Sequence, residues 1–172
     1  MYVIGSTNDT IFQYTLATPW EVNTASYVNK SFLVSGQEST PVALYFKPDG
    51  TKVYIMGSLT DTIHQYSLFV PWDITTAIYD NKFLFVGAQE ATPNGLYFSP
   101  DGTKVYIVGS TTDTVYSYDL EVPWELGLVY SKSLLVSGQE ALPTGVALNN
   151  NLDKLYVVGS GARGLRQYDL LN

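Results

Sequence analysis

The chain has 172 residues, of which 45% are hydrophobic, and its 16 acidic and 9 basic side chains give it a net charge of −7. This length suits one globular domain whose core needs neither disulfides nor a structural metal, and cysteine is absent. The excess of acid argues against nucleic acid as a partner, because affinity for phosphate backbones comes mainly from lysine and arginine. No charged-then-apolar leader precedes Tyr2 and no run of about 18 apolar residues occurs, so we expect neither a signal peptide nor a membrane span.

A five-residue motif, Tyr-x-x-Gly-Ser, recurs four times along the chain. It occupies residues 2–6, 54–58, 106–110 and 156–160, at intervals of 52, 52 and 50 residues. A Pro-Trp-acid motif at residues 19–21, 71–73 and 123–125 and a Gln-Glu pair at residues 37–38, 89–90 and 139–140 keep nearly the same interval. The chain is therefore a tandem repeat, and one unit predicts the architecture of the others.

Within a unit, short β-branched or aromatic runs alternate with turn signals, which is typical of consecutive antiparallel strands. In the best-preserved unit we expect strands at residues 95–98, 104–108, 114–120 and 132–137, with turns at residues 100–103 and 109–113. The first turn reads Pro-Asp-Gly-Thr, in which glycine is free to take a positive φ. Four strands per unit leave no room for a helix longer than about one turn.

The predicted fold class is all-β, because a repeat of four antiparallel strands and about 50 residues is typical of a β-propeller blade. An antiparallel sandwich and an open stack of sheets are the alternatives. We expect a single repeat domain over residues 1–172. Its parts are a partial blade at 1–40, complete blades at 41–92 and 93–142, and a partial blade at 143–172.

Residues 98–109 read Phe-Ser-Pro-Asp-Gly-Thr-Lys-Val-Tyr-Ile-Val-Gly, and residues 46–57 echo them. This run resembles the repeat of the YVTN-type, WD-repeat-like propellers, in which a Ser-Pro-Asp-Gly-Lys turn precedes a Tyr-Val strand. The resemblance implies the blade and no particular activity. The chain differs from that family in having Gly-Ser in place of Thr-Asn and in adding the Pro-Trp-acid loop. Units with that loop are also similar to viral and marine-microbial tandem repeat proteins. This more distant resemblance implies at most a structural or adhesive role. We separately expect an extracellular or virion-associated location.

The two terminal blades are each one strand short. The first unit lacks its innermost strand and the last lacks its outermost strand, so apolar faces and strand edges are left uncovered. We therefore expect self-association, as a homodimer of six to eight blades or as a longer repeat array. A four-bladed monomer is the alternative.

Three glutamates are candidate ligand-binding residues: Glu38, Glu90 and Glu140. Their loops and the turns that carry Asp9, Asp61 and Asp113 belong on one face of a propeller. Carboxylates on such a face could hold calcium through oxygen ligands or accept hydrogen bonds from sugar hydroxyls. Their identity in every unit favours the alternative, a structural role within each blade.

Three tryptophans and two arginines complete the candidate binding residues. Trp20, Trp72 and Trp124 suit stacking against a glycan ring if they are exposed, and anchoring of their own loop if they are buried. Arg163 and Arg166, the only arginines, are expected to meet the acidic loops of a second chain, with a solvated loop as the alternative.

No residue set marks a catalytic or metal site, since His64 is the only histidine and no acid pair differs from its copies. We therefore predict a non-catalytic module without a cofactor, which binds a glycan, peptide or protein and self-associates to complete a ring. An architectural segment of a virion or cell-surface fibre is one alternative. A lactonase-like hydrolase with a cation in the central channel is another, and it would need dissimilar polar residues at the axis.

Overall fold

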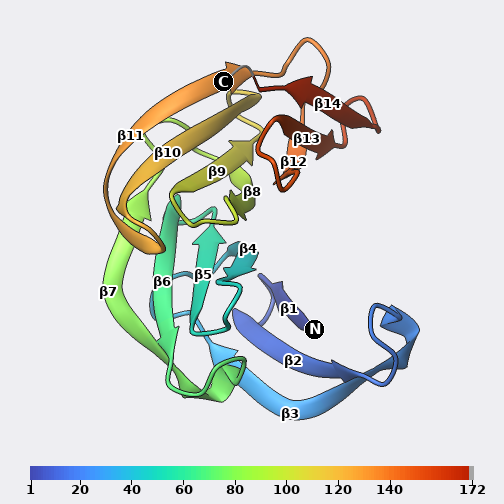
Figure 1. Cartoon of the computed structure of the whole chain (residues 1–172), viewed down its shortest axis with the longest axis vertical. Coiled ribbons are helices and arrows are strands. Elements are labelled where there is room, and N and C mark those ends of the chain that lie inside the picture. Colours follow the sequence, from blue (N-terminus) through green and yellow to red (C-terminus); the bar gives the residue numbers. More distant parts are fainter. Residues whose placement is uncertain (171–172) are drawn as a thin grey trace.

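The computed structural model describes residues 1–170, with the side chains of residues 128–131 excepted. Within this part, fourteen strands form four antiparallel sheets that fan around an axis into an open arc (Figure 1). We number the sheets blades 1 to 4. Blade 1 holds β1 (Tyr2–Gly5), β2 (Thr10–Leu16) and β3 (Ala25–Leu33), and blade 2 holds β4 (Pro41–Phe46), β5 (Lys52–Gly57), β6 (Thr62–Leu68) and β7 (Ala77–Phe85). Blade 3 holds β8 (Pro93–Phe98), β9 (Lys104–Gly109), β10 (Thr114–Val122) and β11 (Glu125–Leu135), and blade 4 holds β12 (Pro143–Leu148), β13 (Lys154–Gly159) and β14 (Leu165–Asp169).

Strands follow one another in each sheet, from the innermost strand outwards. β4, β8 and β12 lie innermost in blades 2 to 4, whereas blade 1 begins with the equivalent of a second strand. The prediction of an all-β fold made of propeller-type blades is confirmed. The last two residues predicted for the fourth blade lie outside the described residues.

The fourth strand of blade 3 begins earlier than predicted. We expected it at residue 132, but β11 starts at Glu125 and pairs with β10 on both sides of an irregularity between Leu120 and Val122. Val122 lies opposite Glu125, so Pro123 and Trp124 make a tight hairpin. In blades 1 and 2 the same loop continues into a single 3-10 turn, η1 (Val22–Thr24) or η2 (Ile74–Thr76), before the outer strand.

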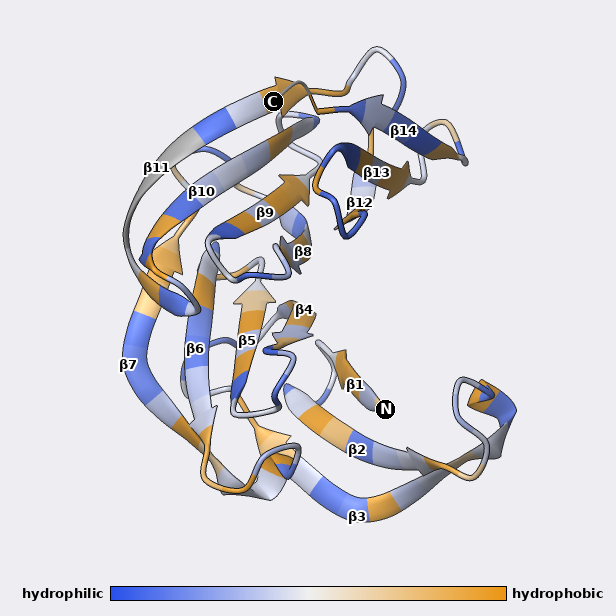
Figure 2. Ribbon diagram, viewed as in Figure 1, coloured by the Kyte–Doolittle hydropathy of each residue, from blue (hydrophilic) through white to orange (hydrophobic). Residues whose placement is uncertain are grey.

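The hydrophobic core is divided into three layers, each between two neighbouring blades. Ile11, Val53 and Ile55 belong to the layer between blades 1 and 2. The layer between blades 2 and 3 contains Tyr54, Met56, Phe98 and Ile107, and that between blades 3 and 4 contains Tyr106, Val108, Leu155 and Val157. Figure 2 shows hydrophobic residues concentrated on the inner strands such as β4, β5 and β9. Each sheet therefore depends on its neighbour to bury its faces.

Tyrosine hydroxyls connect each blade to the backbone of the next. The Tyr45 hydroxyl donates to the carbonyl oxygen of Phe98 at 3.2 Å, and the Tyr97 hydroxyl donates to that of Leu148 at 3.1 Å. Tyrosine suits this position because its ring fills the apolar layer while its hydroxyl finds a polar partner. No helix among the described residues has the length and apolar character needed to cross a bilayer.

Candidate functional site

Glu38, Glu90 and Glu140 are buried and bonded to backbone of their own chain. Their side chains are at most 1% exposed. Glu90 accepts hydrogen bonds from the backbone N–H groups of Thr92 (2.9 Å), Thr111 (3.0 Å) and Thr112 (3.1 Å). Glu38 and Glu140 bind the matching turns of blades 2 and 4. Each glutamate thus clamps the loop that enters a blade to the turn between its second and third strands.

A glycine makes room for each glutamate clamp. A Cβ atom at Gly57 would lie 1.9 Å from Cδ of Glu38, and one at Gly109 would lie 2.4 Å from Cγ of Glu90. Contacts this close do not occur between real atoms, so a larger residue would displace the clamp. The Gly-Ser pair that sets this repeat apart from the YVTN signature therefore accompanies the glutamate.

These carboxylates do not fit a calcium ion. Calcium needs six to eight oxygen ligands, and the glutamate oxygens already accept hydrogen bonds from the chain. No group of three or more acidic, histidine or cysteine side chains is placed to hold a metal within residues 1–170. Asp61 lies near Glu38 and Glu90. Its pKa is raised mainly by burial and to a smaller extent by the negative charges of these two glutamates.

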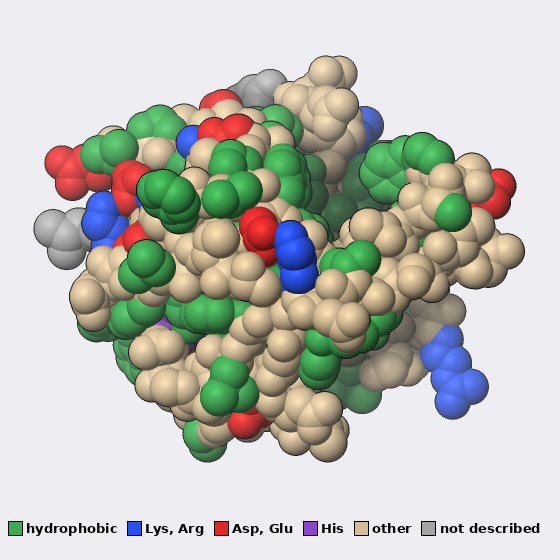
Figure 3. Space-filling model, turned by 90° about the horizontal axis from the view of Figure 1, so that it is seen from below, with side chains coloured by type: hydrophobic (Ala, Val, Ile, Leu, Met, Phe, Trp, Pro, Cys, Tyr) green, Lys and Arg blue, Asp and Glu red, His purple; other side chains and the backbone are tan. Residues whose placement is uncertain are grey.

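The three tryptophans lie in very different surroundings. Trp124 is 8% exposed and stacks on Phe98 with ring centroids 5.6 Å apart, so it anchors its loop. Trp72 is 43% exposed and stacks on Phe46 at 5.5 Å. Trp20 is 95% exposed. In Figure 3 the molecule, seen from below, has a projecting end with hydrophobic side chains on its surface.

Arg163 and Arg166 lie in blade 4, around the turn that Glu140 clamps. Arg166 donates from Nε to the carbonyl oxygen of Gln139 at 3.2 Å. Burial raises the pKa of Glu140, but hydrogen bonds from backbone N–H groups, with a smaller contribution from the charge of Arg166, outweigh it and lower that pKa. Arg163 is exposed, with a left-handed backbone at φ 49°. The two arginines share no common partner in the structure. Their role at an interface with a second chain stays a prediction.

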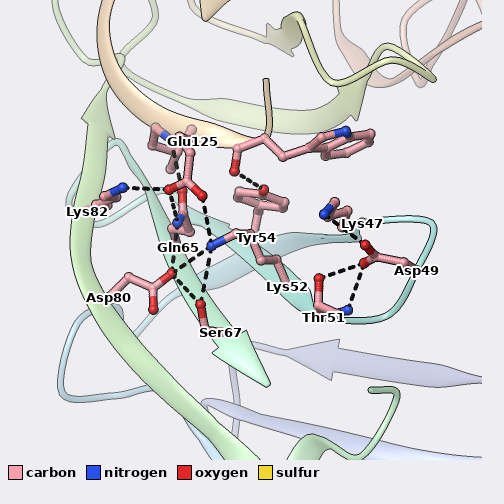
Figure 4. A network of polar contacts seen from close by, with 12 residues as sticks. Lys47, Asp49, Thr51, Lys52, Tyr54, Gln65, Ser67, Asp80, Lys82 and Glu125 are labelled. Carbon is pink, nitrogen blue, oxygen red and sulfur yellow. Dashed lines mark hydrogen bonds and ion pairs between the residues drawn. The ribbon is translucent and has the colours of Figure 1, made fainter. Parts of the chain in front are cut away.

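A polar network centred on Glu125, the acid of the third Pro-Trp-acid motif, connects blades 2 and 3 (Figure 4). Glu125 accepts hydrogen bonds from Lys82 at 2.5 Å and Gln65 at 3.0 Å, and forms an ion pair with Lys52 at 3.1 Å. Gln65 also accepts from the backbone N–H of Leu126 at 2.8 Å. Burial raises the pKa of Glu125, but the contacts with Lys82, Gln65 and Lys52 outweigh it and lower the pKa to about 2. A carboxylate held this strongly in its charged form is suited to joining blades rather than to taking up a proton.

His64 lies in a chain of weak contacts on the face that carries the glutamate clamps. Its Nε2 is 3.5 Å from Oγ1 of Thr60, which donates to Glu38, and its Nδ1 is 3.4 Å from the hydroxyl of Tyr79. Burial lowers the pKa of His64 more than the charge of Glu38 raises it. The imidazole is therefore neutral at pH 7 and fills a partly polar position within blade 2.

The innermost strands carry one feature at which the units differ. Each has a β-bulge at its second residue, between Pro41 and Ala43, Pro93 and Gly95, or Pro143 and Gly145. The bulged residues are Val42, Asn94 and Thr144. Bulges redirect a side chain and are common beside active sites.

Polar groups cluster around two of these bulges. Nδ2 of Asn94 donates to Oγ of Ser110 at 3.2 Å and to the carbonyl oxygen of Pro143 on the neighbouring innermost strand at 3.4 Å. Oγ1 of Thr144 donates to the carbonyl oxygen of Val158 at 3.4 Å. We call Asn94, Ser110 and Thr144 the axial site. These groups are neutral hydrogen-bonding partners for hydroxyl or carbonyl oxygens. Sequence reasoning missed this site because it did not compare the residues at this position, where Val42, Asn94 and Thr144 differ from one another.

Two hollows of about 500 Å³ each lie at the surface, one apolar and one lined by both apolar and polar side chains. The first, in blade 1, is lined by Met1, Leu16, Pro19, Trp20 and Val22. The second lies between blades 3 and 4, where Tyr106, Leu134, Leu152, Leu155 and Leu170 are among its lining residues. Neither hollow reaches the axial site.

No protein-family model matches the chain, and no curated protein matches its sequence. Its fold is similar to that of a candidate 6-phosphogluconolactonase from Bacteroides uniformis, with a TM-score of 0.68 at 14% identity over 98% of this chain and 46% of that protein. A periplasmic gluconolactonase from Pseudomonas aeruginosa matches with a TM-score of 0.62 at 13% identity, over 98% and 48% of the two chains. The β-propeller domain of Cps50 (Swd1) from Myceliophthora thermophila matches at 0.60 and 10% identity, over 99% and 52%. This chain spans about half the length of these proteins.

These similarities correct two of our predictions. We predicted a non-catalytic module and no enzyme, but the propellers that match almost the whole chain include a gluconolactonase and a candidate 6-phosphogluconolactonase. Our reasoning required dissimilar polar residues at the axis for a lactonase-like hydrolase, and it did not recognise Asn94 and Thr144 as such residues.

Proposed function

We propose that this chain is half of a β-propeller that hydrolyses a hydroxyl-rich lactone once further repeat units complete the ring. The observation that carries the proposal is the match of 98% of the chain to about half of a gluconolactonase-type propeller. The bulged, divergent residues of the innermost strands support it, because a ligand on the axis of a ring meets one residue from each blade. In this proposal the blades are of the YVTN type, and the remaining blades come from a second copy or from a longer array.

Hydrolysis of a lactone needs water to add to the ester carbonyl carbon, and the bond from that carbon to the ring oxygen then breaks. The proton lost by the water passes through solvent to the departing ring oxygen, so the product is an open hydroxy acid. The amide of Asn94 would exchange the longer of its two hydrogen bonds, that to the carbonyl oxygen of Pro143, for one to the substrate carbonyl oxygen as negative charge develops there. The hydroxyls of Ser110 and Thr144 are suited to hold substrate hydroxyls.

The neutrality of the axial site favours an unphosphorylated sugar lactone. A phosphate group is normally bound by arginine, lysine or clustered backbone N–H groups. Asn94, Ser110 and Thr144 carry no charge, so they offer nothing that would distinguish a 6-phospho lactone from its parent. The expected substrate is therefore a lactone of the gluconolactone kind.

The test measures hydrolysis of gluconolactone and of 6-phosphogluconolactone above the spontaneous rate, over a range of protein concentrations in which light scattering gives the number of chains per particle. Asn94→Ala is expected to lower kcat/KM about 10²-fold, as loss of one oxyanion donor does in other hydrolases. Val42→Ala, at the same bulge of blade 2, is the matched control and is expected to change kcat/KM less than threefold. A completed ring that hydrolyses neither lactone faster than buffer would overturn the proposal.

A further inference from the structure

We propose that Thr92 and Thr111 are positioning residues of the axial site, because the hydrogen bond between their hydroxyl groups holds the amide of Asn94 in place. Oγ1 of Thr111 donates to Oγ1 of Thr92 at 2.8 Å. Both residues are exposed, and both belong to blade 3, which has all four strands and a neighbouring blade on each side. Their effect on the Asn94 amide can be measured on this chain by itself, whereas their effect on hydrolysis rests on the proposed function.

The side chain of Asn94 lies where the sheet gives it little support. Asn94 is the bulged residue between Pro93 and Gly95, so it is left unpaired in the ladder between β8 and β9. Its amide donates to Oγ of Ser110 at 3.2 Å and to the carbonyl oxygen of Pro143 at 3.4 Å, and both bonds are at or beyond the long end of the usual range. In the proposed reaction the bond to Pro143 is exchanged for one to the substrate. The direction of the amide then depends on Ser110.

Ser110 is held against the strand of Asn94 by three neighbouring contacts. Its own backbone N–H donates to the carbonyl oxygen of Thr92 at 3.2 Å. The backbone N–H groups of Thr92 and Thr111 donate to the same oxygen, Oε1 of Glu90, at 2.9 Å and 3.0 Å. The bond between the two threonine hydroxyls is the third contact. It closes a ring of hydrogen bonds between residues 92–94 and 110–111, and the bond from Asn94 to Ser110 belongs to that ring.

The hydroxyl bond distinguishes blade 3 from blades 2 and 4. In all three blades the serine of the Gly-Ser pair donates its backbone N–H to a carbonyl oxygen in the loop before the innermost strand. These pairs are Ser58 and Thr40 (3.1 Å), Ser110 and Thr92 (3.2 Å), and Ser160 and Leu142 (3.0 Å). The position of Thr111 is Leu59 in blade 2 and Gly161 in blade 4, and neither residue has a hydroxyl. A blade therefore folds without this bond, which occurs in the blade whose bulge carries an asparagine.

The backbone of blade 4 holds the other partner of the amide close to Asn94. A Cβ atom at Gly95 would lie 2.9 Å from Cα of Gly145 and 3.1 Å from the backbone nitrogen of Val146, so β8 and β12 are in direct contact there. The corresponding residue of blade 2 is Ala43. Asn94 thus lies between the backbone of blade 4 on one side and the hydroxyl-bonded turn on the other. A small displacement of either would turn the amide away from the substrate.

The hydroxyl bond is suited to positioning rather than to stabilising the blade. A neutral hydrogen bond at the surface contributes little to the free energy of unfolding, because water replaces it when it is lost. It still restricts the movement of a turn whose serine holds the Asn94 amide. Loss of the bond is therefore expected to change the Asn94 amide without weakening the fold.

The first test follows the side-chain NH₂ signals of Asn94 by nuclear magnetic resonance in the full chain, where Asn94→Ala identifies them by their loss. Thr111→Val keeps the shape of the side chain and removes its hydroxyl. We expect the Asn94 amide protons to exchange with water about threefold faster or more, as the loss of one exposed neutral hydrogen bond implies. The melting temperature is expected to stay within about 2 °C of wild type. Thr111→Ser, which keeps the hydroxyl, is expected to retain the exchange rate of wild type.

Two further variants show whether the hydroxyls of Thr92 and Thr111 act together. Thr92→Val is expected to have the same effect as Thr111→Val, and the double variant no more than either, because all three remove one bond. Thr40→Val, at the position of Thr92 in blade 2, is the matched control and is expected to leave the exchange rate unchanged. Additive effects, or unchanged exchange in both single variants, overturn the proposal. A fall in melting temperature by more than about 5 °C in either single variant overturns it in favour of a structural role.

The second test measures lactone hydrolysis by the completed ring. Thr111→Val is expected to lower kcat about three- to tenfold and to leave KM within about twofold, because the hydroxyl acts through Asn94 and does not touch the substrate. Thr111→Ser is expected to retain the kcat of wild type. An unchanged kcat beside faster amide exchange overturns the role in the reaction. Faster exchange in a ring that hydrolyses no lactone supports the positioning of Asn94 and overturns the proposed function instead.

Discussion

Blades 1 and 3 carry the same Pro-Trp-acid loop with nearly the same backbone conformation, yet expose 95% and 8% of their tryptophans. The difference lies in the innermost strand, since only blade 3 has the Pro-Asp-Gly-Thr turn beneath the ring. The repeat thus allows a direct comparison, because the same residue is buried in one blade and exposed in another. What a residue does is decided by its neighbours rather than by its motif.

The largest expected effect comes from removing the two tryptophans in turn. Trp124→Ala is expected to lower the free energy of unfolding by about 3–5 kcal/mol, because a buried ring stacked on Phe98 is lost. Trp20→Ala is expected to change it by less than about 0.5 kcal/mol, because that ring faces solvent. Urea denaturation of both variants measures the contrast. Equal losses would mean that blade 1 is covered in solution.

The glycines of the clamps give the next largest contrast. Gly109→Ala is expected to cost about 2–3 kcal/mol, since its Cβ would lie 2.3 Å from the carbonyl oxygen of Thr92 and 2.4 Å from Cγ of Glu90. Gly5→Ala in blade 1 is the matched control, with an expected change of about 0.5 kcal/mol or less. Thermal melting of the pair measures it, and a stable Gly109→Ala variant would contradict the role given to the clamp.

The smallest expected effect concerns the junctions between blades. Glu125→Gln is expected to cost about 1 kcal/mol at pH 7, because Lys52 and Lys82 lose their shared carboxylate in a partly exposed network. The pKa of Glu125 is lowered to about 2, so its contribution is full above its usual value near 4.5 and disappears as the pH falls towards 2. The measured stabilities of wild type and variant are therefore expected to converge at low pH. A constant difference across this range would mean that the loss is not electrostatic.

The fold class could be predicted from the sequence because the sequence repeats. Period, turn residues and alternation were enough to predict the strands and the blades, because each blade repeats the same local choices of residue. The start of β11 at Glu125 was not predictable, since the tight hairpin at Trp124 depends on pairing along the whole of β10.

The candidate site was harder to predict because burial depends on tertiary contacts. Three repeated acidic residues, Glu38, Glu90 and Glu140, suggested a binding surface from the sequence. Only the structure shows that their carboxylates point toward backbone N–H groups of the neighbouring turns. Asn94 could have been singled out by aligning the units, since Val42 and Thr144 occupy the same position. Its contacts with Ser110 and Pro143 depend on the bulge and on the neighbouring blade, which periodicity does not reveal.

The division of the hydrophobic core into three layers has a consequence for how the protein unfolds. Each layer joins only two adjacent sheets, and no core is common to all four. Unfolding can therefore begin at a terminal blade and progress along the arc one blade at a time. Amide hydrogen exchange is therefore expected to be slowest in β5 and β9, which are flanked on both sides, and fastest in β1 and β14. A partner bound to either terminal blade would slow amide exchange even in distant blades, because it would stabilise the blade at which unfolding begins.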